Sequence, residues 1–400
     1  MVYLAGIVIT IFLAVLLIGK KHKTTADILL IVWLFVIAFH LFLFYLFIIG
    51  KIYDYPALMG HLPYPLLHGP FLFLYTTALT RQPARFKSVW LIHFVPVFIL
   101  YLFFIPFFML PAAEKINVYR NKGAGYETQM SICLISIIIS GIAYIIASLV
   151  LLRRYRKSIE NEFSNIEKIN LAWLRYLVYG LAVIWIAVIF GNDPIVFGTG
   201  AVFVFFLGYF GIRQTGIFLT GQPQTDLKQI SGIEEKLKGT APADQVKPLP
   251  EEISAKAETA GIITKIKYEK SGLAGDQAGK IYERLVMAMT NQKLFTESEL
   301  TLAALAKVLN VHPNHLSQVI NSYEGKNFYD YINFHRVEEF KNLASRPDNQ
   351  NYTLLSMAYE CGFNSKTSFN RNFRKVTGIS PSEYLSQHHI SLNQDSLHRL

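Results

Sequence analysis

Seven apolar runs fill the first half of the chain and restrict what that half can fold into. A helix needs about 20 apolar residues to cross a membrane, where only helices and closed barrels satisfy every backbone group. The runs are residues 2–18, 28–49, 62–79, 89–110, 131–152, 171–190 and 194–212. We therefore expect residues 1–215 to form a domain of seven membrane-spanning helices, in contact with a lipid bilayer. Prolines in the third and fourth runs are expected to kink those helices: Pro63, Pro65, Pro70, Pro96 and Pro106.

The basic residues between these runs predict the orientation of the chain. Loops one, three and five carry eleven Lys and Arg residues, whereas loops two, four and six carry four. Because basic loops stay on the cytoplasmic side, the N-terminus is expected outside and the chain after Arg213 in the cytoplasm. The net charge of +10 comes almost entirely from residues 1–215, with 17 basic against 8 acidic residues. The basic excess therefore does not by itself identify a DNA-binding face.

Few ionisable groups lie near the predicted membrane interior, and three of them are histidines: His40, His68 and His93. Intramembrane ionisable residues are candidates for function, so we expect these three to take part in sensing; the alternative is ordinary hydrogen bonding between helices. The two cysteines, Cys133 and Cys361, are too few for a cysteine-rich zinc site. We found no catalytic motif, and the sequence predicts neither an enzyme, nor a metal site, nor a cofactor.

The composition changes after the last apolar run. Residues 216–279 are rich in charged residues of both signs and are interrupted by Pro and Gly, which is typical of a flexible linker. Residues 280–388 are expected to form a second helical domain, followed by a tail at 389–400. The predicted fold class is all-α: a seven-helix transmembrane domain joined to an all-helical cytoplasmic domain.

Two similar patterns of short helices occur in that second domain, about 52 residues apart. In the first, Thr301 caps an apolar helix and Pro313 opens the next one. In the second, Thr353 and Ser365 take the two capping positions. Two short helices joined by a tight turn form a helix-turn-helix, whose second helix can enter a DNA major groove. Ser380-Pro381-Ser382-Glu383 predicts a capping box at the start of a last helix.

The residues at these positions make the pattern specific. They are Leu302-Ala303-Ala304-Leu305-Ala306, Gly325-Lys326-Asn327-Phe328, Ile332-Asn333, Arg336, Ala358-x-x-x-Gly362-Phe363-Asn364-Ser365, Phe369-x-x-x-Phe373-Arg374-Lys375, Gly378 and Ser380-Pro381-x-x-Tyr384. This stretch of about 100 residues resembles the tandem helix-turn-helix DNA-binding domain of the AraC/XylS family. The whole arrangement is similar to bacterial membrane-integrated transcriptional regulators. The resemblance therefore implies double-stranded promoter DNA as a partner and the bacterial cytoplasmic (inner) membrane as the location.

The resemblance also implies which residues contact DNA. The base-contacting positions of the family fall on Asn314, Ser317 and Gln318 in the first recognition helix and on Lys366, Thr367, Ser368 and Arg371 in the second. Asn and Gln can pair with adenine, and Arg or Lys with guanine. Lys326, Arg374 and Lys375 are assigned to phosphates, which add affinity but no sequence information.

These features favour a one-component regulator, in which the spans sense an envelope, membrane or small-molecule signal and the tethered domain binds a promoter. A homodimer would raise the local concentration of the second DNA-binding domain. Two alternatives remain open. The first half could be a transporter or a membrane enzyme with an attached autoregulatory DNA-binding domain, or it could be a passive anchor without a sensing role.

Overall fold

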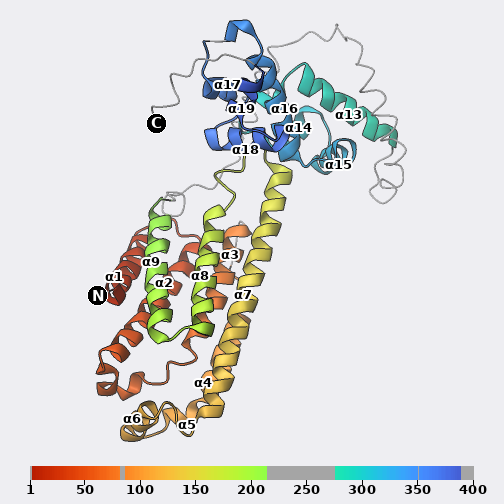
Figure 1. The fold of residues 1–400 in the computed structure, drawn as a ribbon. Coiled ribbons are helices and arrows are strands. Elements are labelled where there is room, and N and C mark those ends of the chain that lie inside the picture. The colour runs from red at the N-terminus through yellow and green to blue at the C-terminus, as the bar shows by residue number, and fades with distance from the viewer. Residues whose placement is uncertain (1, 82–85, 214–274, 350, 389–400) are drawn as a thin grey trace. The chain divides into compact units, whose positions relative to one another are not determined.

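Helices make up the regular structure of the described residues, apart from one isolated antiparallel bridge between Phe163 and Thr301. The computed structural model describes residues 2–81, 86–213, 275–349 and 351–388. The prediction of an all-α fold is confirmed (Figure 1). The chain divides into two units, of which unit 1 contains residues up to Tyr155 and again from Leu171 to Gln224. Unit 2 contains Arg156–Asn170 together with the chain from Thr225 onward.

Unit 1 is a bundle of apolar helices. Its helices are α1 (Val2–Ile18), α2 (Thr25–Ile48), α3 (His68–Thr80), α4 (Val95–Phe103), α5 (Ile105–Phe108), α6 (Ala112–Arg120), α7 (Glu127–Glu162), α8 (Ala172–Phe190) and α9 (Asp193–Arg213). Among these, α2, α7 and α8 are long and apolar enough to cross a membrane, by length and composition. Each of the seven predicted runs contains at least one helix, but the count of seven spans stays a prediction.

Prolines divide the third and fourth runs rather than kinking a continuous helix. The third run begins with a 3-10 turn (Tyr64–Leu67) that precedes the short helix α3. The fourth is split into a 3-10 segment (Ser88–Phe94), α4 and α5, and Pro96 and Pro106 stand in the first turns of these two helices. Proline has no N–H to donate to the preceding turn, so it is accepted where a helix starts.

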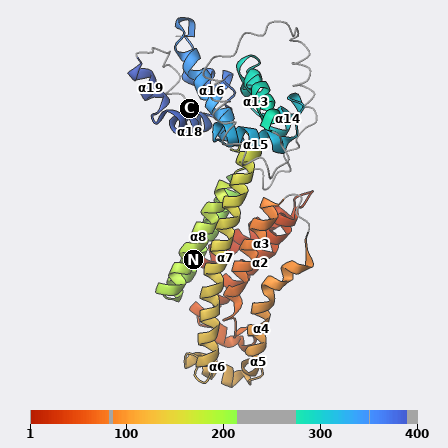
Figure 2. The same ribbon diagram turned by 90° about the vertical axis from the view of Figure 1, so that its right-hand side faces the viewer.

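The core of unit 1 forms where α2 packs against α1 and α3 and where α9 packs against α1 and α8. Figure 2 shows α2 beside α3. Trp33 and Leu34 of α2 lie at its centre and are fully buried. Many apolar side chains nevertheless point outward, for example Phe98 (65% exposed), Ile139 (63%) and Phe190 (84%). Among the described residues, the outer surface of unit 1 is therefore apolar at many positions.

Unit 2 contains two small hydrophobic cores that share one long helix. Its helices are α7 from Arg156 onward, α13 (Gly275–Thr290), α14 (Leu302–Val308), α15 (Pro313–Glu324), α16 (Phe328–Ala344), α17 (Leu354–Glu360), α18 (Lys366–Thr377) and α19 (Pro381–Gln387). The first half of α16 packs with α13, α14 and α15, and its second half packs with α17, α18 and α19. Helix α16 therefore holds the two helix-turn-helix units together.

The predicted caps of unit 2 are confirmed. The side chains of Thr301, Thr353 and Ser365 accept hydrogen bonds from backbone N–H groups in the first turns of their helices, and Ser380 with Glu383 forms the capping box of α19. Helix α13 begins at Gly275, inside the region predicted as linker. The remainder of that predicted linker and the predicted tail at 389–400 lie outside the described residues.

Candidate nucleic-acid interface

The first helix-turn-helix consists of α14 and α15. Asn310, in the turn between them, has a φ of 50°, a left-handed conformation that asparagine tolerates better than most residues. His312 caps α15 by accepting a hydrogen bond from the Asn314 N–H, and Gly325 ends the helix with a φ of 65°. Leu316, Val319 and Ile320 face the core, so the opposite side of α15 is left for contact with a ligand.

The three predicted base-contacting residues of α15 lie on that opposite side. Asn314 is exposed, and Ser317 and Gln318 are half-buried. Helix α15 contains no Lys or Arg. Direct readout by this helix would therefore depend on hydroxyl and amide groups rather than on a guanidinium.

The second helix-turn-helix consists of α17 and α18, and its turn packs closely against backbone. Gly362 has a φ of 93°, and an added Cβ would lie 2.7 Å from the Phe295 carbonyl oxygen and 2.6 Å from that of Thr296. Phe369 and Phe373 of α18 are fully buried against Phe340 of α16. This packing fixes the rotation of α18 and therefore determines which of its residues face outward.

We expect Gly362→Ala to lower the free energy of unfolding of unit 2 by about 2 to 4 kcal/mol, since it combines a strained φ with a clash against backbone. Gly378→Ala is the matched control, because Gly378 has a φ of 83° but no atom within 4 Å of the added Cβ. This control should cost about 1 kcal/mol. Urea unfolding of the two variants measures the difference, and equal losses would contradict the role of the close contact.

Three of the four predicted base-contacting residues of α18 are exposed: Lys366, Thr367 and Arg371. Ser368 does not fit that expectation, because it is only 3% exposed. Its hydroxyl accepts a hydrogen bond from Asn372 Nδ2 at 3.3 Å, and Asn372 is itself 2% exposed. The buried side of α18 therefore includes the polar residues Ser368 and Asn372 in addition to Phe369 and Phe373.

Two of the three residues predicted to contact phosphates already pair with acidic side chains. Lys375 Nζ lies 2.6 Å from Asp330 Oδ1, and Lys326 Nζ lies 3.1 Å from Glu324 Oε2. Arg374, in the last turn of α18, is exposed. Ion pairs at a surface contribute only about 0 to 1 kcal/mol, so an incoming phosphate can replace these carboxylates.

Arg336 of α16 is the best satisfied buried charge of unit 2. It is 1% exposed, and burial lowers the pKa of its guanidinium to about 10, still well above neutral. Nε donates to the Phe295 carbonyl at 2.7 Å, and Nη2 donates to the Glu297 carbonyl at 2.7 Å. Arg336 thus ties the turn before α14 to the helix that joins the two helix-turn-helix units.

A segment of chain that lies far away in the sequence completes this network. The Ser164 hydroxyl accepts from Arg336 Nη2 at 3.2 Å, and the Ser164 carbonyl accepts from Asn333 Nδ2 at 3.0 Å. Glu167 accepts a hydrogen bond from the Ser365 hydroxyl, at the first turn of α18. Sequence reasoning assigned residues 156–170 to a loop of the membrane domain and missed this contact, for which the local sequence carries no signal.

The predicted sensing histidines separate into two groups, both within unit 1. A cavity of about 520 Å³ is lined mainly by apolar and aromatic side chains and contains His40, His68 and His61. His40 Nδ1 lies 2.9 Å from His68 Nε2, and Trp33 Nε1 donates to His68 Nδ1 at 3.2 Å. His93 lies elsewhere and contacts the Tyr144 hydroxyl at 2.9 Å. The structure therefore brings two of the three histidines together.

Comparison with known proteins places the resemblances in the second unit. A family model described as a helix-turn-helix domain matches residues 305–387. The uncharacterized HTH-type transcriptional regulator YijO of Escherichia coli (strain K12) is 35% identical over 97 residues, which are 24% of this chain and 33% of that protein. YtdP of Bacillus subtilis (strain 168), which carries the same description, is 31% identical over 91 residues, 23% of this chain and 11% of that protein. No solved structure gives a significant match to this chain.

The chain spans about a third or less of the length of these two relatives. Residues 305–387 of this chain therefore match a helix-turn-helix domain, and the chain is similar over 91 to 97 residues to proteins described as transcriptional regulators. The residues matched by the family model lie within unit 2.

Proposed function

We propose that this protein is a membrane-integrated, sequence-specific transcriptional regulator, in which unit 1 receives a signal at the cytoplasmic membrane and unit 2 binds a promoter. The observation that carries the proposal is the pair of recognition helices, α15 and α18, each packed by its apolar side against the shared helix α16. Asn314, Ser317 and Gln318 would contact bases of one half-site, and Lys366, Thr367 and Arg371 those of the other.

Selection of bound DNA from a random pool tests this proposal. The full-length protein in lipid nanodiscs should select one bipartite sequence, whose two halves lie about one helical turn apart. We expect Gln318→Ala to relax the preference in one half and Arg371→Ala in the other, each by about 10- to 100-fold, because a good bidentate contact contributes about 1 to 3 kcal/mol to discrimination. Binding that is blind to sequence and is lost at higher salt would contradict sequence-specific regulation.

For the sensing role we propose the cavity of unit 1, and the hydrogen bonds around it suggest the chemistry of its ligand. An indole N–H can only donate, so His68 Nδ1 accepts from Trp33, and a neutral His68 then donates from Nε2 to His40 Nδ1. A neutral His40 then carries its proton at Nε2, and this N–H is the group that can donate a hydrogen bond to a ligand in the cavity. We therefore expect a small molecule with an apolar body and one hydrogen-bond-accepting oxygen.

A series of ligands with equal chain length tests the cavity. All four tryptophans lie in unit 1, so their fluorescence reports its thermal unfolding. A ten-carbon methyl ketone or fatty acid should stabilise unit 1 more than decane does, and the stronger of the two identifies the head group. We expect His40→Phe to weaken binding of that ligand about 3- to 10-fold, the usual worth of one hydrogen bond. His93→Phe is the control and should bind normally; equal losses in both variants would contradict the assignment.

A further inference from the structure

Residues 163–167 dock on the DNA-binding domain by backbone and side-chain contacts within unit 2. Phe163 forms the isolated bridge with Thr301, and the Ser164 N–H donates to the Leu300 carbonyl at 3.1 Å. Asn165 Nδ2 donates to Glu299 Oε1 at 3.1 Å. Ser164 is 1% exposed in this position. The segment thus adds to the edge of the domain at the start of α14, and we call it the docking segment.

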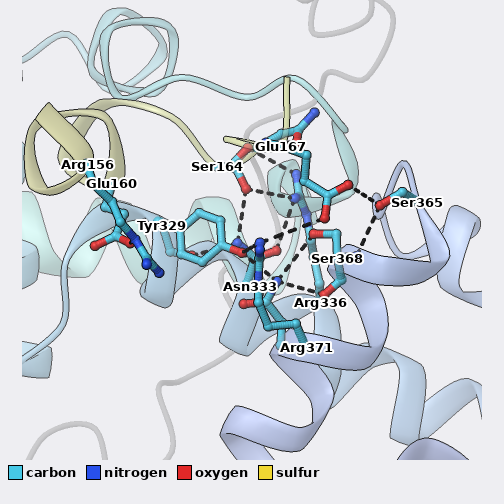
Figure 3. Close-up of polar contacts among 12 residues, drawn as sticks. Arg156, Glu160, Ser164, Glu167, Tyr329, Asn333, Arg336, Ser365, Ser368 and Arg371 are labelled. Carbon is cyan, nitrogen blue, oxygen red and sulfur yellow. Dashed lines mark hydrogen bonds and ion pairs between the residues drawn. The ribbon is translucent and has the colours of Figure 1, made fainter. Parts of the chain in front are cut away.

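The docking segment ends with a carboxylate on the second recognition helix. Glu167 accepts from the hydroxyl of Ser365, the N-cap of α18, and its Oε1 lies 3.8 Å from Arg371 Nη2 (Figure 3). A carboxylate is favoured at this end of a helix because the aligned backbone dipoles leave a partial positive charge there. The same two features, a helix N-terminus and an exposed guanidinium, are those that bind DNA phosphates and base edges.

We infer that the docking segment is an autoinhibitory element, in which Glu167 occupies the end of α18 that DNA must approach and excludes DNA until the segment is released. This inference rests on the proposed DNA-binding function. Arg371, one of the residues proposed to read bases, is held by Glu167 and by the Tyr329 hydroxyl at 2.7 Å. A negative charge at this position also repels the DNA backbone.

The contact of Glu167 is suited to reversible release. Its Oε1 is buried without a hydrogen-bond partner, and the side chain of Arg371 is 42% exposed. A buried acceptor without a hydrogen bond destabilises the docked state, and an ion pair that is open to solvent offsets little of this cost. The docked state is therefore stabilised mainly by Ser164 and Asn165, while Glu167 places its negative charge at the end of α18 and excludes DNA there.

The position of the docking segment in the chain connects this block to unit 1. It follows α7 and precedes α8, two of the helices that are long and apolar enough to cross a membrane. A change at either helix reaches the docking segment through the covalent chain. A signal bound in unit 1 shifts DNA affinity only if it favours the docked or the released state, since a ligand moves only equilibria whose states it binds unequally.

The first test compares two charge-neutralising variants in the full-length protein. Glu167→Gln should tighten binding to the selected DNA about tenfold, because it removes the blocking charge. Glu160→Gln is the matched control: it removes the same charge from the same stretch of chain, but Glu160 pairs with Arg156 at 2.8 Å (Figure 3). It should change affinity less than twofold. Equal effects of the two variants would overturn the inference and would indicate a general electrostatic contribution.

The second test traps the docked state covalently. It compares the linked and the reduced form of one double-cysteine variant, and these two forms carry the same charge. Glu167→Cys/Ser365→Cys is joined by a short bis-methanethiosulfonate linker, which a reductant removes. Linked protein should lose most DNA binding, and reduction should restore it. Failure to form the link, or linked protein that binds DNA as well as the reduced form does, would overturn the inference. If no variant, linked or reduced, binds DNA, then the proposed function has failed, which is a distinguishable result.

Discussion

Arg336→Met should destabilise unit 2 by about 3 to 5 kcal/mol, one of the two largest effects we expect from this structure. The methionine fills most of the volume but donates no hydrogen bond. The carbonyl of Phe295, 2.7 Å from Nε, would then lose this donor while buried, and the Glu297 carbonyl would lose Nη2 and keep the Leu300 N–H at 3.2 Å. Arg346→Met is the control: Arg346 is exposed, and its replacement should change stability by less than about 0.5 kcal/mol.

Cysteine labelling in urea measures this effect in the intact protein. Cys361 lies in unit 2 and is fully buried, and burial raises the pKa of its thiol to about 12. It should therefore react only after unit 2 unfolds. Tryptophan fluorescence reports unit 1 separately and should be unaffected by Arg336→Met. A labelling midpoint equal to that of the Arg346→Met control would show that the Arg336 network does not hold unit 2 together.

The elements of unit 2 that could be predicted are those determined locally. Thr301, Thr353 and Ser365 each precede an apolar helix, and a cap needs only its own first turn to form. Only the first residues of α13, 275–279, were assigned to the linker, while Ile281, Leu285 and Ala288 of the same helix fell inside the predicted domain. Gly275, Asp276 and Gly279 resemble the linker in composition, and they carry no apolar pattern that marks the start of a helix.

The errors within the candidate site have a different cause. Ser368 was expected to face DNA because the resemblance assigns its position to base contact, yet it shares the buried side of α18 with Asn372, whose amide donates to the Ser368 hydroxyl and carbonyl. Polar residues that pair internally leave no apolar pattern to detect. The contact of Ser164 with Arg336 joins positions 172 residues apart, so no local periodicity could indicate it.

Unit 1 shows the limit of apolar runs as a guide. Each run contains at least one helix, but α6 lies outside all of them, and the runs could not distinguish a span from two shorter helices. Pro96 and Pro106 can either kink a helix or begin a new one, and here they stand in the first turns of α4 and α5. The choice depends on the neighbours that satisfy the freed carbonyl groups, which lie outside the run itself.

The other large effect should come from the basic residues assigned to phosphates. Lys326→Ala/Arg374→Ala/Lys375→Ala should weaken DNA binding about 10²- to 10³-fold near physiological salt and lower the slope of log affinity against log salt by nearly 3, because each phosphate contact contributes about 0.9. The selected DNA sequence should stay the same, since phosphate contacts carry no base information. Binding titrations of the full-length protein at several salt concentrations measure the affinity and the slope.

The control for this variant removes equal charge from elsewhere in unit 2, as Lys280→Ala/Lys341→Ala/Arg346→Ala. Its slope should change little, and a slope as low as that of the first variant would mean that only the net charge of unit 2 matters. The first variant carries an additional penalty, because Asp330 and Glu324 now pair with Lys375 and Lys326. Without the lysines the negative charge of these carboxylates would no longer be offset by a neighbouring ammonium group and would repel the phosphates. Restoring Lys375 by itself should therefore recover more than a third of the lost binding free energy, since it neutralises Asp330 as well as contacting DNA.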